Sequence, residues 1–166
     1  MQLPRYAKLE LERRWLVEPV RLPDLAEAAF RRIDDLYLDG GRLRLRAIAH
    51  PDGARELKLG KKYERTHPAG GPIATLYLTQ SEYAAFAGLP GVRLVKRRYA
   101  VDGFSLDVFE GALTGLVLAE VEVDSPATLS AIVPPPWAGR EVTEDPFFTG
   151  GNLCRARPED LLAKLA

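Results

Sequence analysis

The chain has little of what several common kinds of functional site require. It carries one cysteine, Cys154, so no disulfide can form within the chain and a reducing compartment is expected. The two histidines, His50 and His67, stand in proline-containing turn sequence without a partner at metal-ligand spacing. No Gly-rich segment ends in Gly-Lys-Ser or Gly-Lys-Thr, and no Ser-His-Asp order supports a serine nucleophile. These absences argue against a disulfide framework, a histidine metal site, a phosphate loop and a serine hydrolase.

Long hydrophobic runs and an excess of one charge are also missing. No segment approaches the length of a membrane-spanning helix, and the first ten residues lack an apolar signal-peptide core. Lys plus Arg number 23 and Asp plus Glu number 23, so the formal net charge is zero. Proteins that coat nucleic acid or anionic membranes are usually basic, so we expect neither partner. The sequence therefore predicts a cytoplasmic protein.

The chain does have the length and composition of an ordinary globular domain. It has 166 residues, of which 46% are hydrophobic and 28% are charged. No internal repeat or linker divides it, so we expect one domain over residues 1–166.

Alternating residues predict many short strands. The period-two pattern, interrupted by turn sequence, indicates strands over 8–17, on both sides of Asp39-Gly40-Gly41, and over 55–65, 73–78, 92–101, 104–111 and 116–124. Helices are predicted over 21–32, over 81–88 with a Thr79/Glu82 capping box, briefly over 125–133, and over 158–166, whereas 134–152 is predicted as loop. This order indicates an α+β fold: a closed antiparallel eight-stranded β-barrel, or tunnel, with a charged interior and short peripheral helices.

Each predicted strand has one apolar face and one ionic face. Glu10, Glu12 and Arg14 share one side of the first strand, for example. Antiparallel sheets commonly have one wet face, so each ionic face alone could be merely solvated. However, these faces are nearly single-signed, and like charges on neighbouring strands destabilise a sheet. A metal ion and a polyanion between them would supply both counter-charges.

A series of motifs, in order along nearly the whole chain, carries a family resemblance. They are Glu10-Leu11-Glu12-Arg13-Arg14, the strand with Arg44 and Arg46, "ELKLG" with Lys58, "VKRRY" with Lys96 and Arg98, the acidic block with Asp107, Glu120 and Glu122, and "VTEDPFFTGGNL". In order and spacing they resemble the CYTH family, the triphosphate tunnel metalloenzymes. That family includes inorganic triphosphatases, thiamine triphosphatases and class IV adenylate cyclases.

The resemblance implies hydrolysis of a triphosphate that depends on Mg²⁺ or Mn²⁺, with inorganic tripolyphosphate as the first candidate and an organic triphosphate as the second. It assigns phosphate binding to Arg14, Arg44, Arg46, Lys58, Lys96 and Arg98. It assigns metal binding to Glu10, Glu12, Asp107, Glu120 and Glu122, and catalytic roles to Glu120, Glu122 and Arg14.

Two positions depart from the family pattern. Arg14 stands where lysine is usual, and the stretch "TLYL" offers Thr75 and Tyr77 where a pair of glutamates is usual. Two alternatives stay open: a class IV cyclase, which needs a pocket for adenine and ribose, and a non-catalytic binder of polyphosphate or nucleotide. The sequence also leaves a homodimer open.

Overall fold

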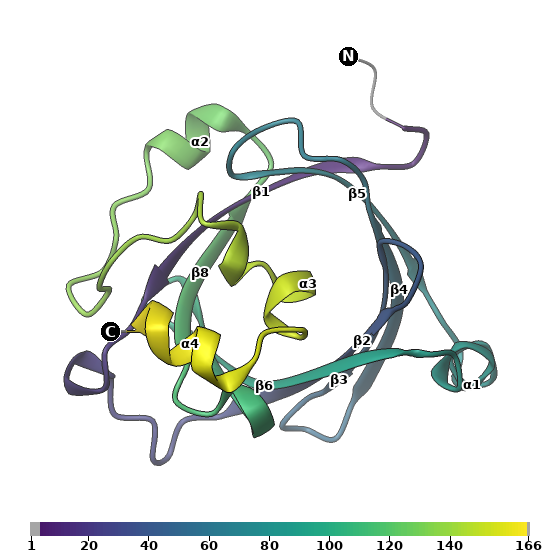
Figure 1. Cartoon of the computed structure of the whole chain (residues 1–166), viewed down its shortest axis with the longest axis horizontal. Helices are drawn as coiled ribbons and strands as arrows, with labels where there is room; N and C mark the ends of the chain where they lie inside the picture. The colour runs from purple at the N-terminus through teal and green to yellow at the C-terminus, as the bar shows by residue number, and fades with distance from the viewer. Residues whose placement is uncertain (1–3, 166) are drawn as a thin grey trace.

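Eight antiparallel strands close into a barrel in the computed structural model, which describes residues 4–165 (Figure 1). Around the barrel the strands follow the order β1-β5-β4-β3-β2-β6-β7-β8. The strands are β1 Lys8–Leu16, β2 Phe30–Leu38, β3 Leu43–Ala49, β4 Arg55–Lys62, β5 Gly70–Tyr77, β6 Gly91–Val101, β7 Phe104–Phe109 and β8 Val117–Val123. The prediction of an α+β fold built on a closed eight-stranded barrel is confirmed.

The turn between β2 and β3 fixes how these two strands pair. Gly40 has a φ of +75°, a left-handed conformation that glycine adopts without steric cost. The resulting register places Tyr37 opposite Arg44 and Asp35 opposite Arg46. Residues directly opposite each other in an antiparallel pair lie on the same face, so these four side chains share one side of the sheet.

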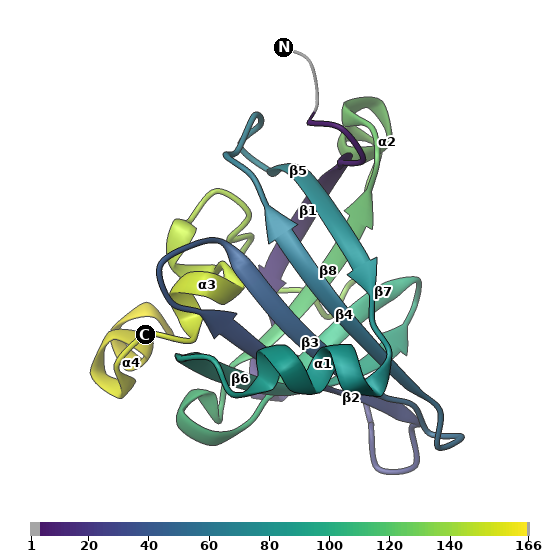
Figure 2. The ribbon, with the colours of Figure 1, turned by 90° about the vertical axis from the view of Figure 1, so that its right-hand side faces the viewer.

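That side is the barrel interior, because the other side is covered by helix α1 (Gln80–Ala87), which lies outside the barrel (Figure 2). Leu36 and Leu45 are buried against Tyr83 and Phe86 of α1. The predicted Thr79/Glu82 capping box is present at the start of this helix. The apolar faces therefore look outward beneath covering segments, and the ionic faces look inward.

The outer apolar face of the opposite wall is covered by other segments. Leu11 of β1 packs on Leu129 of helix α2 (Pro126–Ser130), and Trp15 lies in a cluster that includes Trp137. Burying a leucine side chain stabilises the fold by about 1.5–3 kcal/mol, so this inside-out arrangement still has a substantial apolar core.

The C-terminal segment closes one end of the barrel. It contains the 3-10 turn η3 (Pro146–Phe148) and the helices α3 (Gly150–Leu153) and α4 (Pro158–Leu165), and Figure 1 shows α3 in front of the barrel opening. Phe148 and Leu153 of this segment are buried against Leu94, Phe109 and Leu118 from the strands. An apolar plug therefore fills this end, and the charged residues lie deeper in the barrel.

Two secondary-structure predictions are wrong, one of a helix and one of a loop. The predicted helix over 21–32 is absent: only the 3-10 turn η1 (Pro19–Arg21) forms nearby, and β2 begins at Phe30. The Asp24 carboxylate accepts a hydrogen bond from the Ala26 N–H at 3.0 Å in a local turn, and residues 30–32 pair with β6 instead. The predicted loop over 134–152 contains η3 and α3, which pack on the barrel end.

The remaining short elements agree with the sequence. The predicted terminal helix is present as α4 as far as Leu165, and residue 166 lies outside the described part of the chain. A further 3-10 turn, η2 (Gly111–Leu113), joins β7 to β8. Among residues 4–165, no helix has the length and apolar character needed to cross a membrane.

Candidate active site in the barrel interior

The structure brings the predicted site residues together inside the barrel. Cross-strand register places each of them on an inward face: Glu10, Glu12 and Arg14 on β1, Arg44 and Arg46 on β3, Lys58 on β4, Lys96 and Arg98 on β6, Asp107 on β7, and Glu120 and Glu122 on β8. Except for Lys58, they form, together with Asp35 of β2, two clusters of cations around buried aspartates and one group of glutamates.

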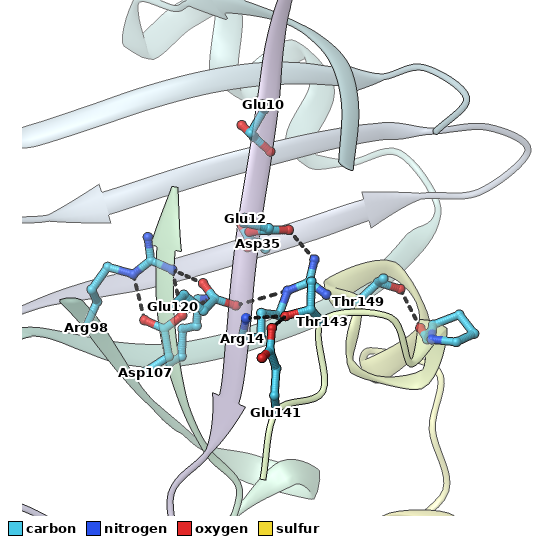
Figure 3. A network of polar contacts seen from close by, with 12 residues as sticks. Glu10, Glu12, Arg14, Asp35, Arg98, Asp107, Glu120, Glu141, Thr143 and Thr149 are labelled. Carbon is cyan, nitrogen blue, oxygen red and sulfur yellow. Dashed lines mark hydrogen bonds and ion pairs between the residues drawn. The ribbon is translucent and has the colours of Figure 1, made fainter. Parts of the chain in front are cut away.

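The first cluster joins β6, β7 and β8 around Asp107. The Arg98 Nε and Nη2 atoms each lie 2.6 Å from an Asp107 oxygen, and Lys96 Nζ donates to the same carboxylate. Arg98 Nη2 also lies 2.7 Å from Glu120 Oε2 (Figure 3). Asp107 is 0% exposed. Burial alone would raise the pKa of Asp107, but Lys96 and Arg98 lower it to about 2.

The second cluster joins β2 and β3 around Asp35, which the sequence analysis did not select. Arg46 Nε and Nη2 donate to the two Asp35 oxygens at 2.6 and 2.7 Å, and Arg44 Nε lies 3.8 Å away. Asp35 is 1% exposed. Burial would raise its pKa, but Arg46 and Arg44 lower it to about 2. Counting back from the Asp39-Gly40-Gly41 turn would have placed Asp35 opposite Arg46.

Arg14 lies between the glutamates of β1 and β8. Its Nη2 donates to Glu12, its Nε lies 3.7 Å from Glu120 Oε1, and its backbone N–H donates to Thr143 Oγ1 at 3.0 Å (Figure 3). Its Nη1 is buried and, among the described residues, has no hydrogen-bond acceptor. Leaving a buried donor unsatisfied costs about 1–3 kcal/mol, more for a charged group, so this nitrogen needs an acceptor that the described residues do not supply.

The remaining glutamates form an acidic group near the other end of β1. Lys62 Nζ lies 2.7 Å from Glu10 Oε1 and 3.8 Å from Glu12 Oε1. Burial and the charges of Glu10 and Glu12 raise the pKa of Glu122. Lys62 was also missed by the sequence analysis, although it shares the strand face of Lys58 by period two.

Lys58 stands apart from the other predicted phosphate ligands. Its Nζ lies 2.6 Å from Glu56 Oε2 and 4.9 Å from the centre of the Tyr77 ring. His50 Nε2 lies 2.6 Å from the other Glu56 oxygen. The register also places Thr75 and Tyr77 of β5 on the inward face, as predicted, and β5 contains no carboxylate.

The carboxylates of the barrel interior are the candidate ligands for a metal ion. Among residues 4–165, no group of three or more His, Cys, Asp or Glu side chains is gathered closely enough to hold one. Asp107 already accepts from both Lys96 and Arg98. However, Mg²⁺ in phosphate-binding sites commonly takes one or two carboxylates together with substrate phosphates. The oxygen donors of Glu10, Glu12 and Glu122 suit that mode, and the pKa of Glu122 is raised first by burial and then by the negative charges of Glu10 and Glu12, which a cation would neutralise.

Sequence comparisons find inorganic triphosphatases among the relatives of this chain, although no family model matches it. The inorganic triphosphatase of Nitrosomonas europaea is 36% identical over 129 residues, which are 70% of this chain and 85% of that protein. The inorganic triphosphatase of Acetivibrio thermocellus is 35% identical over 68 residues, 40% of this chain and 42% of that protein.

A solved structure of an inorganic triphosphatase also resembles this chain. The crystal structure of the inorganic triphosphatase NE1496 matches with a TM-score of 0.56 and 27% identity, covering 90% of this chain and 96% of that one. A structure from Bacillus halodurans, with a TM-score of 0.51 and 16% identity over 75% of this chain and 86% of that one, shares the fold alone.

The fold and the site define an inside-out barrel, with apolar residues outside and paired charges within. With a relative 36% identical across 85% of that relative's length, the chain belongs to the CYTH family, the triphosphate tunnel metalloenzymes.

Proposed function

We propose that this protein hydrolyses a triphosphate inside the barrel, with inorganic tripolyphosphate as the first substrate and an organic triphosphate as the second. The observation that carries the proposal is the buried Arg14 Nη1, which lacks an acceptor among the described residues and belongs to an inner barrel wall that carries further cations on β3 and β6. Phosphate oxygens are acceptors of the right charge for it. The names of the two curated relatives, both inorganic triphosphatases, support the same substrate class.

The basic residues would bind and orient the phosphate chain. Arg44, Arg46, Lys96 and Arg98, with Arg14, offer N–H donors from three strands, and guanidinium forks bind phosphate oxygens in pairs. In phosphoryl transfer, charge develops on the phosphate oxygens, so positioning and electrostatic stabilisation supply most of the catalysis. Lys58, held at Glu56, is proposed to act at the edge of this set.

The acidic residues have two proposed tasks. Glu10, Glu12 and Glu122 would hold Mg²⁺ or Mn²⁺, which when bound neutralises phosphate charge and acts as a Lewis acid. Glu120 lies between Arg98 and Arg14, where its carboxylate can orient the attacking water and accept its proton. Asp107 was predicted as a metal ligand, but its contacts with two cations favour the task of holding them.

The test is product analysis with tripolyphosphate and ATP, each with and without Mg²⁺ or Mn²⁺. We expect orthophosphate release that requires the cation and is lost in Arg14→Gln. Arg13→Gln is the matched control, because Arg13 lies on the outer face and pairs with Glu141 at 2.7 Å. Cyclic AMP from ATP would indicate a cyclase instead. An inactive wild type, or equal loss in both variants, would overturn the proposal.

A second candidate is triphosphate binding without turnover. It is favoured by β5, where the inward Thr75 and Tyr77 add no carboxylate to the acidic group. Calorimetry that detects tripolyphosphate binding in a protein without hydrolytic activity would establish it. Three expectations from the sequence stay predictions: one domain over 1–166, a cytoplasmic location and no nucleic-acid partner. The possible homodimer also stays a prediction.

A further inference from the structure

Asp35 is a buried carboxylate that no step of the proposed hydrolysis uses. It lies on β2 directly opposite Arg46, and its two oxygens accept the Nε and Nη2 donors of Arg46 at 2.6 and 2.7 Å. Arg44, two residues earlier on β3, places its Nε 3.8 Å from the same carboxylate. A group this buried cannot reach solvent, so all its interactions are with the walls of the barrel.

The arrangement is repeated on the adjacent strand pair, β6 and β7. Asp107 lies directly opposite Arg98, binds its Nε and Nη2, and also accepts from Lys96 two residues earlier. In both places one buried aspartate joins two basic side chains of the neighbouring strand. The same geometry on separate strand pairs argues that the Asp35 contact is more than an isolated ion pair.

We propose that Asp35 is a positioning residue, which holds the guanidinium groups of Arg44 and Arg46 in the orientation that stabilises the charge developing on the phosphate oxygens during hydrolysis. An arginine side chain has five N–H donors, and Asp35 accepts only two from Arg46. Within residues 4–165 the other Arg46 donors have no hydrogen-bond acceptor, so they can bind phosphate. The carboxylate also offsets the repulsion between two neighbouring guanidinium groups before any ligand is bound. This inference rests on the proposed function.

A positioning role has a kinetic signature that differs from loss of a cation. Replacing Asp35 by asparagine keeps the size of the side chain and every cation of the barrel, and makes the interior more positive. Attraction of a polyanion should not weaken, so KM should stay the same or fall. Orientation of the guanidinium groups is lost, so kcat should fall by about tenfold to a hundredfold, the range seen when support for a binding group is removed.

The experiment compares Asp35→Asn with Asp34→Asn in tripolyphosphate hydrolysis. Asp34 is the neighbouring residue on the outer face, where it pairs with the half-exposed Arg93 at 2.7 Å, so its variant should keep wild-type kinetics. A folded Asp35→Asn protein with unchanged kcat, or with a KM that rises instead, would overturn the positioning role.

A second measurement uses the unaltered protein and covers the case in which Asp35→Asn fails to fold. In NMR spectra without ligand, we expect Arg46 to show separate, slowly exchanging Nη signals, because Asp35 restrains its guanidinium group. Arg21, whose side chain is 50% exposed and whose Nε lies 3.7 Å from Glu18 Oε2, is the control and should show averaged signals. Averaged Arg46 signals would overturn the positioning role, whereas an inactive wild type would overturn the proposed function, so the two failures are distinguishable.

Discussion

The two sides of the barrel interior handle their charges differently. On the basic side, Asp35 and Asp107 each sit between two cations, and the cluster around Asp35 keeps a net positive charge. On the acidic side, Glu10 and Glu12 share Lys62, and burial and these neighbours raise the pKa of Glu122. The basic side is thus ordered before a ligand arrives, whereas the acidic side carries charge that a bound cation would relieve.

This difference explains how like charges can line one barrel without unfolding it. Buried charges are tolerated when they are paired and hydrogen-bonded, as the aspartates are. Unpaired repulsion on the acidic side should instead cost stability. The contrast predicts that changes on the two sides have opposite effects on stability, although both reduce activity.

The largest effect is expected on turnover when either of two β8 glutamates is changed: Glu120 beside the basic cluster or Glu122 on the acidic side. Glu120→Gln and Glu122→Gln should each lower metal-dependent kcat by about a hundredfold or more, because each removes a carboxylate proposed to bind the cation or accept a proton. Glu122→Gln should leave the melting temperature unchanged or raise it, since it removes repulsion with Glu10 and Glu12. Activity assays and thermal scans of each variant measure both effects. Wild-type activity in either variant would show that the carboxylate replaced has no part in turnover.

An intermediate effect is expected on the basic side. Arg44→Ala and Arg46→Ala should each lower kcat/KM by about tenfold or more, because a charge-assisted hydrogen bond contributes about 1.5–3 kcal/mol. Arg42→Ala is the internal control: Arg42 lies outside β3 at the rim and donates to the Tyr63 carbonyl at 2.9 Å. If Arg42→Ala were as damaging as Arg44→Ala, the division between rim and interior would be wrong.

A smaller effect is expected on stability as the pH changes. The pKa of Asp35 is about 2 in the folded protein, below the ordinary value of an unfolded aspartate. Its stabilising contribution is therefore present above the unfolded pKa, near 4, and is lost as the pH falls towards 2, amounting to about 2 kcal/mol. The difference in unfolding free energy between wild type and Asp35→Asn should shrink over that range in denaturant titrations. A difference that stays constant from pH 5 to pH 2 would contradict the ion pair.

The contribution of Glu122 to stability should change with pH in the opposite direction. Its pKa is raised in the folded protein, so its favourable contribution is present below the unfolded pKa and is lost as the pH rises through the folded value. Wild type should therefore lose stability relative to Glu122→Gln as the pH rises above the ordinary glutamate range. An increasing stability of wild type over Glu122→Gln would show that this carboxylate is paired.

Most of the inward-facing charges could be predicted from the sequence, because side chains along a strand alternate between its two faces. That rule assigned Arg44 and Arg46 to one face and Glu120 and Glu122 to another, and the barrel register agrees. It could not choose between Asp34 and Asp35, which are adjacent and chemically identical. Only the position of Gly40 in the turn decides which of them is opposite Arg46.

Other features depend on contacts that a local pattern does not contain. Thr143 reaches Arg14 from a distant loop, and the plug formed by Phe148 and Leu153 depends on tertiary packing. The predicted helix over 21–32 failed because residues 30–32 gain strand pairing with β6, which outweighs their local helical pattern.

The central claim is that the basic and acidic sides together bind one triphosphate with its cation. The most direct measurement is the melting temperature of the wild-type protein in four solutions: buffer, Mg²⁺, tripolyphosphate, and both. Ligands that bind the folded state raise its stability by mass action. The account predicts a rise with tripolyphosphate alone and a rise with both that exceeds the sum of the separate shifts. No shift at millimolar tripolyphosphate, with or without Mg²⁺, would contradict it.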